Sequence, residues 1–598
     1  MGCFVVPGLT ILCGRNLEQR RQRAEAFSKQ STPSCQRHEL HAVYEAEGIE
    51  ALFSRHPGYP SLSVQSSGVR LFVEGQIGLS QGDLLTMSEQ LVAPGADGCE
   101  VATRWLRDVD GEFLLLVSAD HNPQVILLTD LYGHLPLYRG RCADGEILTR
   151  EIGVACDAAV EASPDPLSIA SYLSLGFVPG DGTLHSNVDR VDSGTLIRID
   201  RSGIQQFRWA GHAAEAKATA GRERASEIAQ EIMHATEQRL RWAGESARVL
   251  SLSGGLDSRA VAGSMVRSGE PSLLAATFRD NAAKSLEDVD GARRVAELVG
   301  LRWSVHDIPG PTETAEDELF EIKWGLNDLH MATVLPFFHD LILHHGRSVH
   351  YFTGDTGVPF RPILPKRRIR SERMFLDRLF SQDGRFLYRR ALFDVETSCR
   401  AARIRRSVFE DWLLEIAKGC SRGSSWDERY RGFIWDGCVR KWAYEGMDRN
   451  RAYFWLCAPL GATRVLNRLL VVQDIHKEHL RFYAQILERI DSKLLSIPRA
   501  GERFPPGSPL RALSGHLDAV WNHVVARLGK SRRGPGGAGR REPGSVHRVR
   551  DAWKQSEHAQ SVLDLETLLD AALTPQRVAI MSTLVRFSHR LEEVRAQR

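Results

Sequence analysis

The sequence predicts a two-part fold, in which an antiparallel, layered α+β domain precedes an α/β domain with a helical C-terminal part. A chain of 598 residues is long enough for two or more domains that each bury a core. Short apolar segments between turn residues dominate the first part of the chain, which is typical of antiparallel sheets. Helical segments and compact apolar strands then alternate, which predicts a parallel, doubly wound sheet.

The elements follow in order along the chain. Strands are expected at 70–74, 112–117, 124–128 and 194–199, then at 248–252 and 272–277, with helices at 223–242 and 259–267. The predicted units are a domain at 1–210, a second at 211–528, a flexible Gly/Arg-rich loop at 529–548 and a helical segment at 549–598.

Composition excludes several classes of protein. Hydrophobic residues make up 42% and charged residues 25%, which excludes wholesale disorder. The net charge of +2 favours neither a nucleic acid nor a membrane surface as partner. No apolar run approaches the roughly 18 residues of a membrane-spanning helix. The 10 cysteines form no CxxC pair, so we expect a reduced protein located in the cytoplasm.

The strongest chemical signal is the segment VLSLSGGLDS at residues 249–258, where a strand enters a turn that opens a helix. Two glycines allow backbone N–H groups to approach an anion, and the helix N-terminus favours negative charge. Ser253 and Ser258 offer hydroxyl donors, and Asp257 can hold magnesium. No Gly-Lys-Ser/Thr follows, so this is not a Walker-type loop. The alternative is a plain helix-capping turn.

SGGLDS matches the pyrophosphate-loop motif of the asparagine synthetase superfamily, which the chain resembles over most of its length. Three further segments match that family in order: DGEF at 110–113 with DLYGHLPLY at 130–138, GFVPGDGTL at 176–184, and the helix at 285–300. The resemblance implies an N-terminal-nucleophile-type amidotransferase domain, then a pyrophosphate-loop (adenine-nucleotide α-hydrolase-like) synthetase domain. It also implies a carboxylate-adenylating activity that uses ATP and Mg²⁺.

The resemblance also assigns site residues. Those expected at the nucleotide are Leu252, Ser253, Gly254, Gly255, Leu256, Asp257, Ser258, Thr277, Thr353 and Gly354, with Asp257 and Asp355 at the metal. Asp355 belongs to the segment TGDTGVP at 353–359, which resembles the family's second loop, and is also a catalytic candidate. Val358 and Pro359 depart from that loop's Asp-Glu, which leaves the metal and the adenylation step open. The alternative for Asp355 is a surface turn.

A late lysine contacts substrate in this family, and the segment DIHKEHLR at 474–481 resembles the helix that carries it. Lys477 is therefore the second catalytic candidate, with Arg481 as support, although a solvated helix face is the alternative. Arg449 and Arg451 are candidates for either substrate contacts or structural ion pairs.

The glutaminase half departs from its family at four places. The chain begins Met1-Gly2-Cys3, so removal of Met1 would expose Gly2 and not the nucleophilic cysteine. The segments 55–58, 74–78 and 97–101 lack the family's glutamine-binding residues. Glu74 stands where an amide donor is expected, and an ionised carboxylate cannot donate a hydrogen bond. We expect an inactive glutaminase and a buried, structural Cys3.

Other clusters of charged or metal-ligating residues are weaker indications of a functional site. The pairs His344–His345 and Asp328/His330 lack a third ligand in the sequence, so we expect structural roles. The basic stretches at 366–373 and 530–541 are expected to be solvated.

The predicted function is an ATP-dependent amide ligase in which a substrate amine attacks the adenylated carboxylate. Among such ligases the sequence favours a lasso-peptide macrolactam cyclase over a β-lactam synthetase. Its partners would be a carboxylate-bearing small molecule or a precursor peptide, with a leader-peptide protease. The alternatives are a glutamine-hydrolysing asparagine synthetase or sugar-acid amidotransferase, and a nucleotide-binding scaffold without activity.

Overall fold

The computed structural model describes most of the chain. The described residues are 3–4, 6–14, 17–18, 21–22, 38–120, 122–161, 163–200, 203–211, 218–219, 221–270, 273–280, 283–310, 312–364, 368–381, 392–420, 425–499, 502, 504–506, 508, 543–571 and 573–596.

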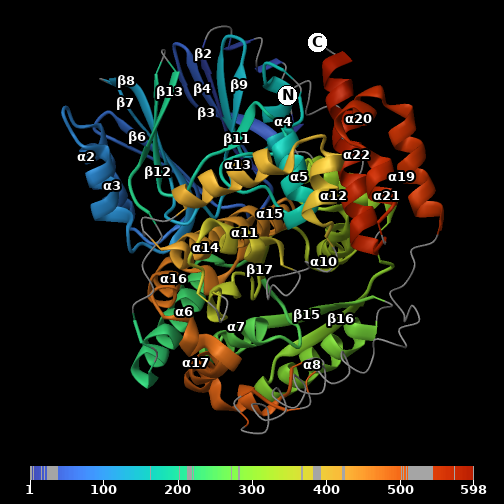
Figure 1. The fold of residues 1–598 in the computed structure, drawn as a ribbon. Helices are drawn as coiled ribbons and strands as arrows, with labels where there is room; N and C mark the ends of the chain where they lie inside the picture. The colour runs from blue at the N-terminus through green and yellow to red at the C-terminus, as the bar shows by residue number, and fades with distance from the viewer. Residues whose placement is uncertain are drawn as a thin grey trace, which may run out of the picture.

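The first part of the chain forms two antiparallel sheets (Figure 1). The seven-stranded sheet has the order β1 (Cys3–Phe4), β3 (His38–Ala46), β4 (Ile49–Ser54), β2 (Gly8–Gly14), β10 (Gly145–Thr149), β9 (Tyr138–Cys142) and β11 (Val188–Arg190). The six-stranded sheet has the order β13 (Gly203–Arg208), β12 (Thr195–Asp200), β8 (Asn122–Thr129), β7 (Gly111–Ala119), β6 (Val69–Ile77) and β5 (Ser61–Ser66).

Strand β7 shows why this part is layered. Leu114 and Leu116 belong to the core shared with the other sheet, beside residues such as Ile11. Phe113 and Leu115 belong to a core on the opposite face, with helix residues such as Leu84. Successive strand residues point to opposite faces, so an unbroken apolar run requires cover on both sides.

Helices supply the outer cover of both sheets. Helices α2 (Gln81–Val92) and α3 (Gly98–Leu106) lie on the six-stranded sheet, and α4 (Ile152–Ala158) and α5 (Pro166–Leu175) lie on the seven-stranded one. The predicted layered α+β arrangement and the strands predicted inside residues 1–210 are confirmed.

The second part contains a five-stranded sheet in which every neighbouring pair is parallel. Its order is β16 (Arg302–Asp307), β15 (Leu273–Arg279), β14 (Ala247–Ser251), β17 (Val349–Phe352) and β18 (Trp455–Cys457). From β14 the chain adds β15 and β16 on one side and then returns to add β17 on the other. The gap between β14 and β17 is therefore a topological switch point, where parallel sheets bind ligands at the carboxyl ends of their strands.

The rest of this part of the chain is largely helical (Figure 1). In chain order they are α6 (Arg222–Trp242), α7 (Leu256–Arg267), α8 (Ala283–Val299), α9 (Glu313–Lys323), η1 (Leu329–Val334), α10 (Leu335–His345), η2 (Val358–Phe360), α11 (Glu372–Phe380), α12 (Val395–Ala401), α13 (Arg406–Gly419), α14 (Trp426–Ile434), η4 (Trp435–Ala443), α15 (Tyr444–Arg451), η5 (Pro459–Gly461), α16 (Thr463–Leu470), η6 (Asp474–Leu480), α17 (Arg481–Asp491) and η7 (Ser492–Ser496).

The chain ends in a group of helices that packs at one side of the molecule, against α12 and η1 (Figure 1). They are α19 (Pro543–Gln555), α20 (Glu557–Val562), α21 (Leu565–Leu569) and α22 (Pro575–Ala596). Helix α19 starts before the predicted residue 549, with Pro543 in the first turn, where a missing N–H costs nothing. Most of the predicted 529–548 loop and the basic stretch at 530–541 lie outside the described residues, and the domain boundaries stay predictions.

No helix within the described residues is long and apolar enough to cross a membrane.

Candidate active site

Two loops at the switch point pack directly against each other. Residues 252–255 follow β14 and lead into α7, whose N-cap is Gly255, and residues 353–357 follow β17. A Cβ on Gly354 would lie 2.3 Å from the Ser258 nitrogen, and one on Gly357 would lie 2.3 Å from the Asp257 Cγ. The two loops meet at these positions with room for glycine alone.

Hydrogen bonds hold the first loop in shape. The hydroxyls of Ser253 and Ser258 lie 3.0 Å apart, and the Gly255 N–H donates to Ser253 Oγ at 3.2 Å. The Gly254 N–H donates to Asp288 Oδ1 of α8 at 2.8 Å, so one backbone donor of the loop already faces an anionic oxygen. The two hydroxyls and the N-terminus of α7 suit the binding of a phosphate group, which would have to displace Asp288 to reach the Gly254 N–H.

Two cavities adjoin these loops and share Asp257, Gly354 and Asp355. The smaller, of about 290 Å³, is lined by both loops and by Phe278, Phe338, Tyr351, Arg449 and Asn450. The larger, of about 580 Å³, is lined by the second loop and by Arg361, Pro362, Trp442, Lys477, His479 and Leu480. A molecule bound in one cavity therefore meets a molecule bound in the other beside the two carboxylates.

The Asp257 carboxylate pairs with one cation. Its Oδ2 accepts a hydrogen bond from Arg361 Nη2 at 2.8 Å, and its buried Oδ1 lies near the Tyr483 hydroxyl, the one donor of the described residues within reach of this carboxylate besides Arg361. The hydroxyl of Tyr483 is near enough that this carboxylate, after burial itself, raises the pKa of Tyr483. A buried carboxylate oxygen fits an oxygen-seeking divalent cation.

Asp355 completes the acidic pair. Its side chain is exposed to the cavity, but the surrounding protein raises the pKa of its carboxyl group, and Asp257 raises it further. Thr353 and Arg449 act in the opposite direction. Asp257 and Asp355 offer the carboxylate oxygens that magnesium prefers, and the Arg361 guanidinium already occupies Oδ2 of Asp257.

Lys477 faces the larger cavity from η6. Its side chain is 0% exposed, and burial lowers its pKa from 10.5 to about 7, although Asp474 raises it. The Nζ atom lies 3.6 Å from Asp474 Oδ1, too far for a hydrogen bond. Lys477 is thus a buried amine with donors to spare for a ligand.

The predicted helix that carries Lys477 and Arg481 is wrong in detail. His479 (φ 54°) and Leu480 (φ 59°) have left-handed backbone conformations, so the chain turns between η6 and α17. Lys477 consequently faces inward, whereas Arg481, at the start of α17, is exposed and lines neither of the two cavities.

Backbone strain gathers at the larger cavity. Thr356 (φ 69°), His479 and Leu480 all line it, and all adopt a conformation that costs a non-glycine residue of order 1 kcal/mol or more. Strained residues of this kind cluster at binding and catalytic sites.

The structure brings most of the predicted nucleotide residues together. Those that line the smaller cavity are Ser253, Gly255, Asp257, Ser258, Thr353 and Gly354, beside the predicted metal ligand Asp355. Leu252 and Leu256 are instead buried in an apolar core, and Thr277 Oγ1 donates to the Leu252 carbonyl at 2.7 Å. These last three residues support the loop from behind.

Sequence reasoning missed Arg361, Trp442 and the three aromatic residues of the smaller cavity, because no local motif carries them. The glycine at position 357 was the one sequence feature that could have indicated how closely the second loop packs on Asp257. Of the paired alternatives, Arg449 lines the smaller cavity, while Arg451 makes a structural ion pair with Glu112. Asp328 caps η1 by accepting a hydrogen bond from the His330 N–H at 3.1 Å, which is a structural role.

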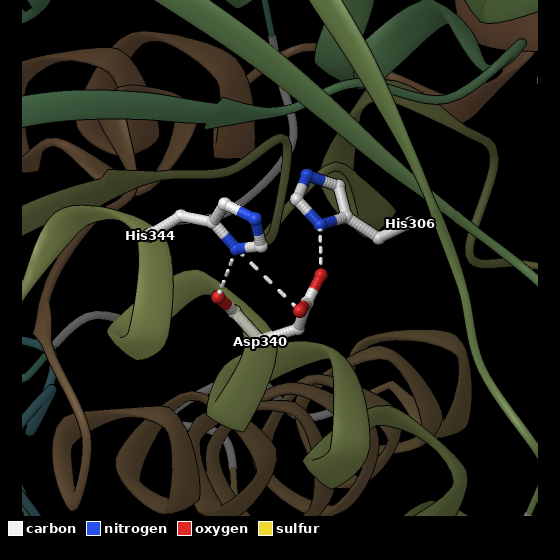
Figure 2. Close-up of side chains that lie close together, drawn as sticks. All are labelled: His306, Asp340 and His344. Carbon is white, nitrogen blue, oxygen red and sulfur yellow. Dashed lines mark hydrogen bonds and ion pairs between the residues drawn. The ribbon is translucent and has the colours of Figure 1, made fainter.

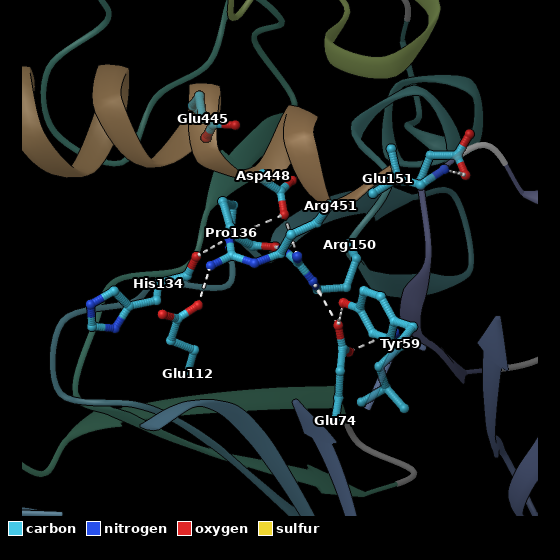
Figure 3. Close-up of polar contacts among 12 residues, drawn as sticks. Tyr59, Glu74, Glu112, His134, Pro136, Arg150, Glu151, Glu445, Asp448 and Arg451 are labelled. Atoms are coloured by element: carbon cyan, nitrogen blue, oxygen red, sulfur yellow. Dashed lines mark hydrogen bonds and ion pairs between the residues drawn. The ribbon is translucent and has the colours of Figure 1, made fainter. Parts of the chain in front are cut away.

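In the first part of the chain, Glu74 is held in a buried network (Figure 3). It accepts hydrogen bonds from the Leu9 N–H at 2.8 Å, the Tyr59 hydroxyl at 2.6 Å and Arg150 Nε at 2.9 Å. Its neighbour Gln76 accepts from Trp455 Nε1 at 2.8 Å, in the second part of the chain.

The other two predicted glutamine-site segments also make local structural contacts. Asp97 caps α3, accepting from the Cys99 N–H at 2.9 Å, and Arg55 donates to Ser61 Oγ at 3.2 Å on the surface. The side chain of Cys3 lies outside the described residues.

Charged residues continue this network across the two parts (Figure 3). Asp448 of α15 pairs with Arg150 and, at 2.9 Å, with Lys323 of α9. Glu445 of α15 pairs with Lys323 at 2.5 Å and with Arg190 at 2.8 Å. All these side chains are at most 3% exposed, so the two parts meet through alternating buried charges.

No protein-family model matches the chain, and no curated protein matches it. Among solved structures, it is similar to the glutamine phosphoribosylpyrophosphate (PRPP) amidotransferase from B. subtilis complexed with ADP and GMP, at 10% identity and a TM-score of 0.22, over 60% of this chain and 82% of that one. It is also similar to a structure of the allosteric regulatory enzyme of purine biosynthesis, at 11% identity and a TM-score of 0.21, over 52% and 76%. At TM-scores this low, neither likeness supports a conclusion about function.

Proposed function

We propose that this chain is an ATP-dependent ligase that forms amide bonds. It adenylates a carboxylate, releases pyrophosphate, and joins the acyl group to a substrate amine with release of AMP. Within this class we favour closure of a macrolactam in a precursor peptide, as in lasso-peptide cyclases, with a leader-peptide protease acting on the same precursor.

The observation that carries the proposal is the meeting of two unlike cavities at Asp257 and Asp355. The smaller offers hydroxyls, a helix N-terminus and aromatic rings, which suits an adenine nucleotide. The larger is roomier and combines Trp442 with the buried amine of Lys477, which suits a bulky substrate that carries a carboxylate.

The geometry supports a specific division of labour. The substrate carboxylate attacks the α-phosphorus as the bond to pyrophosphate breaks, and Ser253, Ser258 and the N-terminus of α7 hold the pyrophosphate charge. Lys477 supplies positive charge beside the carboxylate. Asp355, whose pKa is raised, accepts the proton from the attacking amine as AMP leaves. Magnesium at Asp257 and Asp355 would neutralise phosphate oxygens.

The state of Glu74 supports a substrate amine over ammonia from glutamine. Its two carboxylate oxygens are engaged by Leu9, Tyr59 and Arg150, so it offers neither a donor nor free space to an oxyanion. A glutamine-hydrolysing asparagine synthetase or sugar-acid amidotransferase is the alternative, and it requires glutamine to serve as the nitrogen source.

The test is exchange of labelled pyrophosphate into ATP with a panel of acids: aspartate, a β-lactam-type precursor, and peptides bearing Asp or Glu. We expect exchange with one acid, a loss of at least 100-fold in Asp257→Asn, and no loss in Asp377→Asn, which alters an exposed aspartate on α11. The responding acid names the substrate class. Adding glutamine, ammonia or a peptide amine then identifies the nucleophile.

A scaffold without catalytic activity is the competing proposal, and Val358 with Pro359 in place of Asp-Glu favours it. ATP binding with no exchange for any acid would overturn the ligase and leave the scaffold.

A further inference from the structure

Three metal-ligating side chains meet away from the candidate active site (Figure 2). His306 lies on β16, and Asp340 and His344 lie one turn apart on α10. One ligand atom from each residue falls within 4.8 Å of the other two. The sequence showed His344 only beside His345, with no further ligand. The packing of α10 against β16 brings His306 and Asp340 to His344.

Asp340 contacts both imidazole rings. Its Oδ2 lies 2.5 Å from His306 Nδ1, and its Oδ1 lies 3.4 Å from His344 Nδ1, which also donates to the Asp340 main-chain carbonyl oxygen at 2.8 Å (Figure 2). On the far side of the His306 ring, Nε2 lies 2.9 Å from Ser304 Oγ. A serine hydroxyl can donate or accept, so it satisfies Nε2 in either tautomer and leaves Nδ1 free to bind a cation.

We propose that His306, Asp340 and His344 form a binding site for a divalent transition-metal ion of the zinc class, separate from the proposed ligase function. Imidazole nitrogen with carboxylate oxygen is a ligand set for zinc, whereas magnesium takes oxygen ligands alone. Zinc bonds of about 2.0–2.1 Å place tetrahedral ligands roughly 3.4 Å apart. The two separations of Asp340 from the imidazole nitrogens are 2.5 Å for His306 and 3.4 Å for His344.

The exposure of the three side chains determines how an ion would reach the site. His306 is buried, Asp340 is 39% exposed and His344 is 60% exposed, so an ion enters from solvent and keeps water in its remaining position. Binding moves the His306 proton from Nδ1 to Nε2, which then donates a hydrogen bond to Ser304 Oγ. The ion replaces the hydrogen bond of His306 Nδ1 to Asp340, and binding through His344 Nδ1 also requires that its proton move to Nε2 and that its hydrogen bond to the Asp340 carbonyl break.

The site would fasten an edge of the parallel sheet. Strand β16 is the edge strand, and α10 is the element that the metal would tie to it. The His306 ring packs on Phe337 at 5.2 Å, and Phe337 packs on Phe278 at 5.6 Å, which lines the smaller cavity. The metal would thus stabilise the wall behind that cavity without touching its contents.

The experiment measures metal on the full-length, chelator-treated protein by equilibrium dialysis against Zn²⁺, with bound zinc counted by mass spectrometry. We expect His344→Ala and Asp340→Asn each to lose one equivalent or to weaken it at least tenfold. We expect His345→Ala, the next residue of the same helix, to keep it. Zn²⁺ should also raise the melting temperature of the wild type and His345→Ala, and Mg²⁺ should not.

Zinc binding that is equal in His344→Ala, Asp340→Asn and His345→Ala would overturn the proposal, because the zinc would then be held elsewhere. Since the readouts are bound metal and melting temperature, neither depends on the ligase reaction. Failure here leaves the exchange experiment untouched, and the reverse also holds.

Discussion

At the scale of single residues, the candidate site depends on charges that are buried or crowded. Lys477 keeps an amine in a fully buried position, and Asp257 keeps one carboxylate oxygen buried. Such groups cost stability in the free protein, which natural proteins tolerate at sites where a ligand later relieves the cost.

Lys477 makes the stability depend on pH. Its pKa is about 7 in the folded chain and 10.5 when unfolded, so the unfolded chain binds more protons between these values and stability rises with pH across that window. The full cost, about 5 kcal/mol, applies below pH 7. We expect Lys477→Met to melt at a higher temperature than the wild type at pH 6 and to converge with it near pH 10.

Asp474 keeps hydrogen bonds from the Ile363 and Leu364 N–H groups, so the variant retains its local structure. Lys418→Met, at an exposed lysine, is the control and should show no such trend. A difference in melting temperature that stays constant from pH 6 to pH 10 would contradict the assignment of the lowered pKa to Lys477.

At the scale of elements, the first loop is shaped as much by its neighbours as by its own residues. Helix α8 approaches so closely that a Cβ on Gly291 would lie 2.8 Å from the Gly254 Cα. The second loop presses on the start of α7 in the same way. The loop motif is local in sequence, but its conformation needs both contacts.

Gly291→Ala tests this dependence. In an open helix, alanine in place of glycine stabilises by about 1 kcal/mol, but at Gly291 the added methyl group must displace the loop. We expect the KM for ATP in pyrophosphate exchange to rise at least tenfold.

Gly419→Ala in α13 is the matched change, since nothing lies within 4 Å of its added methyl group. It should leave the KM unchanged and keep or raise the melting temperature. Equal behaviour of the two variants would mean that α8 does not hold the loop.

At the scale of the whole molecule, the two parts of the chain are joined by buried ion pairs. Residues of the segments that resemble the family's amidotransferase domain, such as Asp110, Glu112 and Tyr138, contact α6, α15 and α9. In this structure these residues hold the two parts of the chain together.

Arg150→Met tests the joint. It leaves Glu74 and Asp448 without their shared cation in a buried place, which costs about 3–5 kcal/mol. Arg150 and Lys323, against burial, lower the pKa of Asp448 to about 2. The ion pairs therefore contribute above pH 3.8, and their contribution is lost as the pH falls toward 2.

The measurement is the denaturation midpoint at pH 7, compared with Arg70→Met. Arg70 pairs with Asp120 on the surface, with both side chains about half exposed, and its loss should cost less than about 1 kcal/mol. A similar small cost for Arg150→Met would mean that the buried pairs do not join the two parts.

Period, turn residues and loop motifs are local properties, so they predicted the layered first part, some of the strands and the two glycine-rich loops. Long-range packing was needed to show that Arg361 neutralises Asp257, that Lys477 faces inward while Arg481 does not, and that His306 and Asp340 join His344. These contacts link residues far apart in the chain or depend on a backbone turn at His479 and Leu480. Packing sets them, and no periodicity records them.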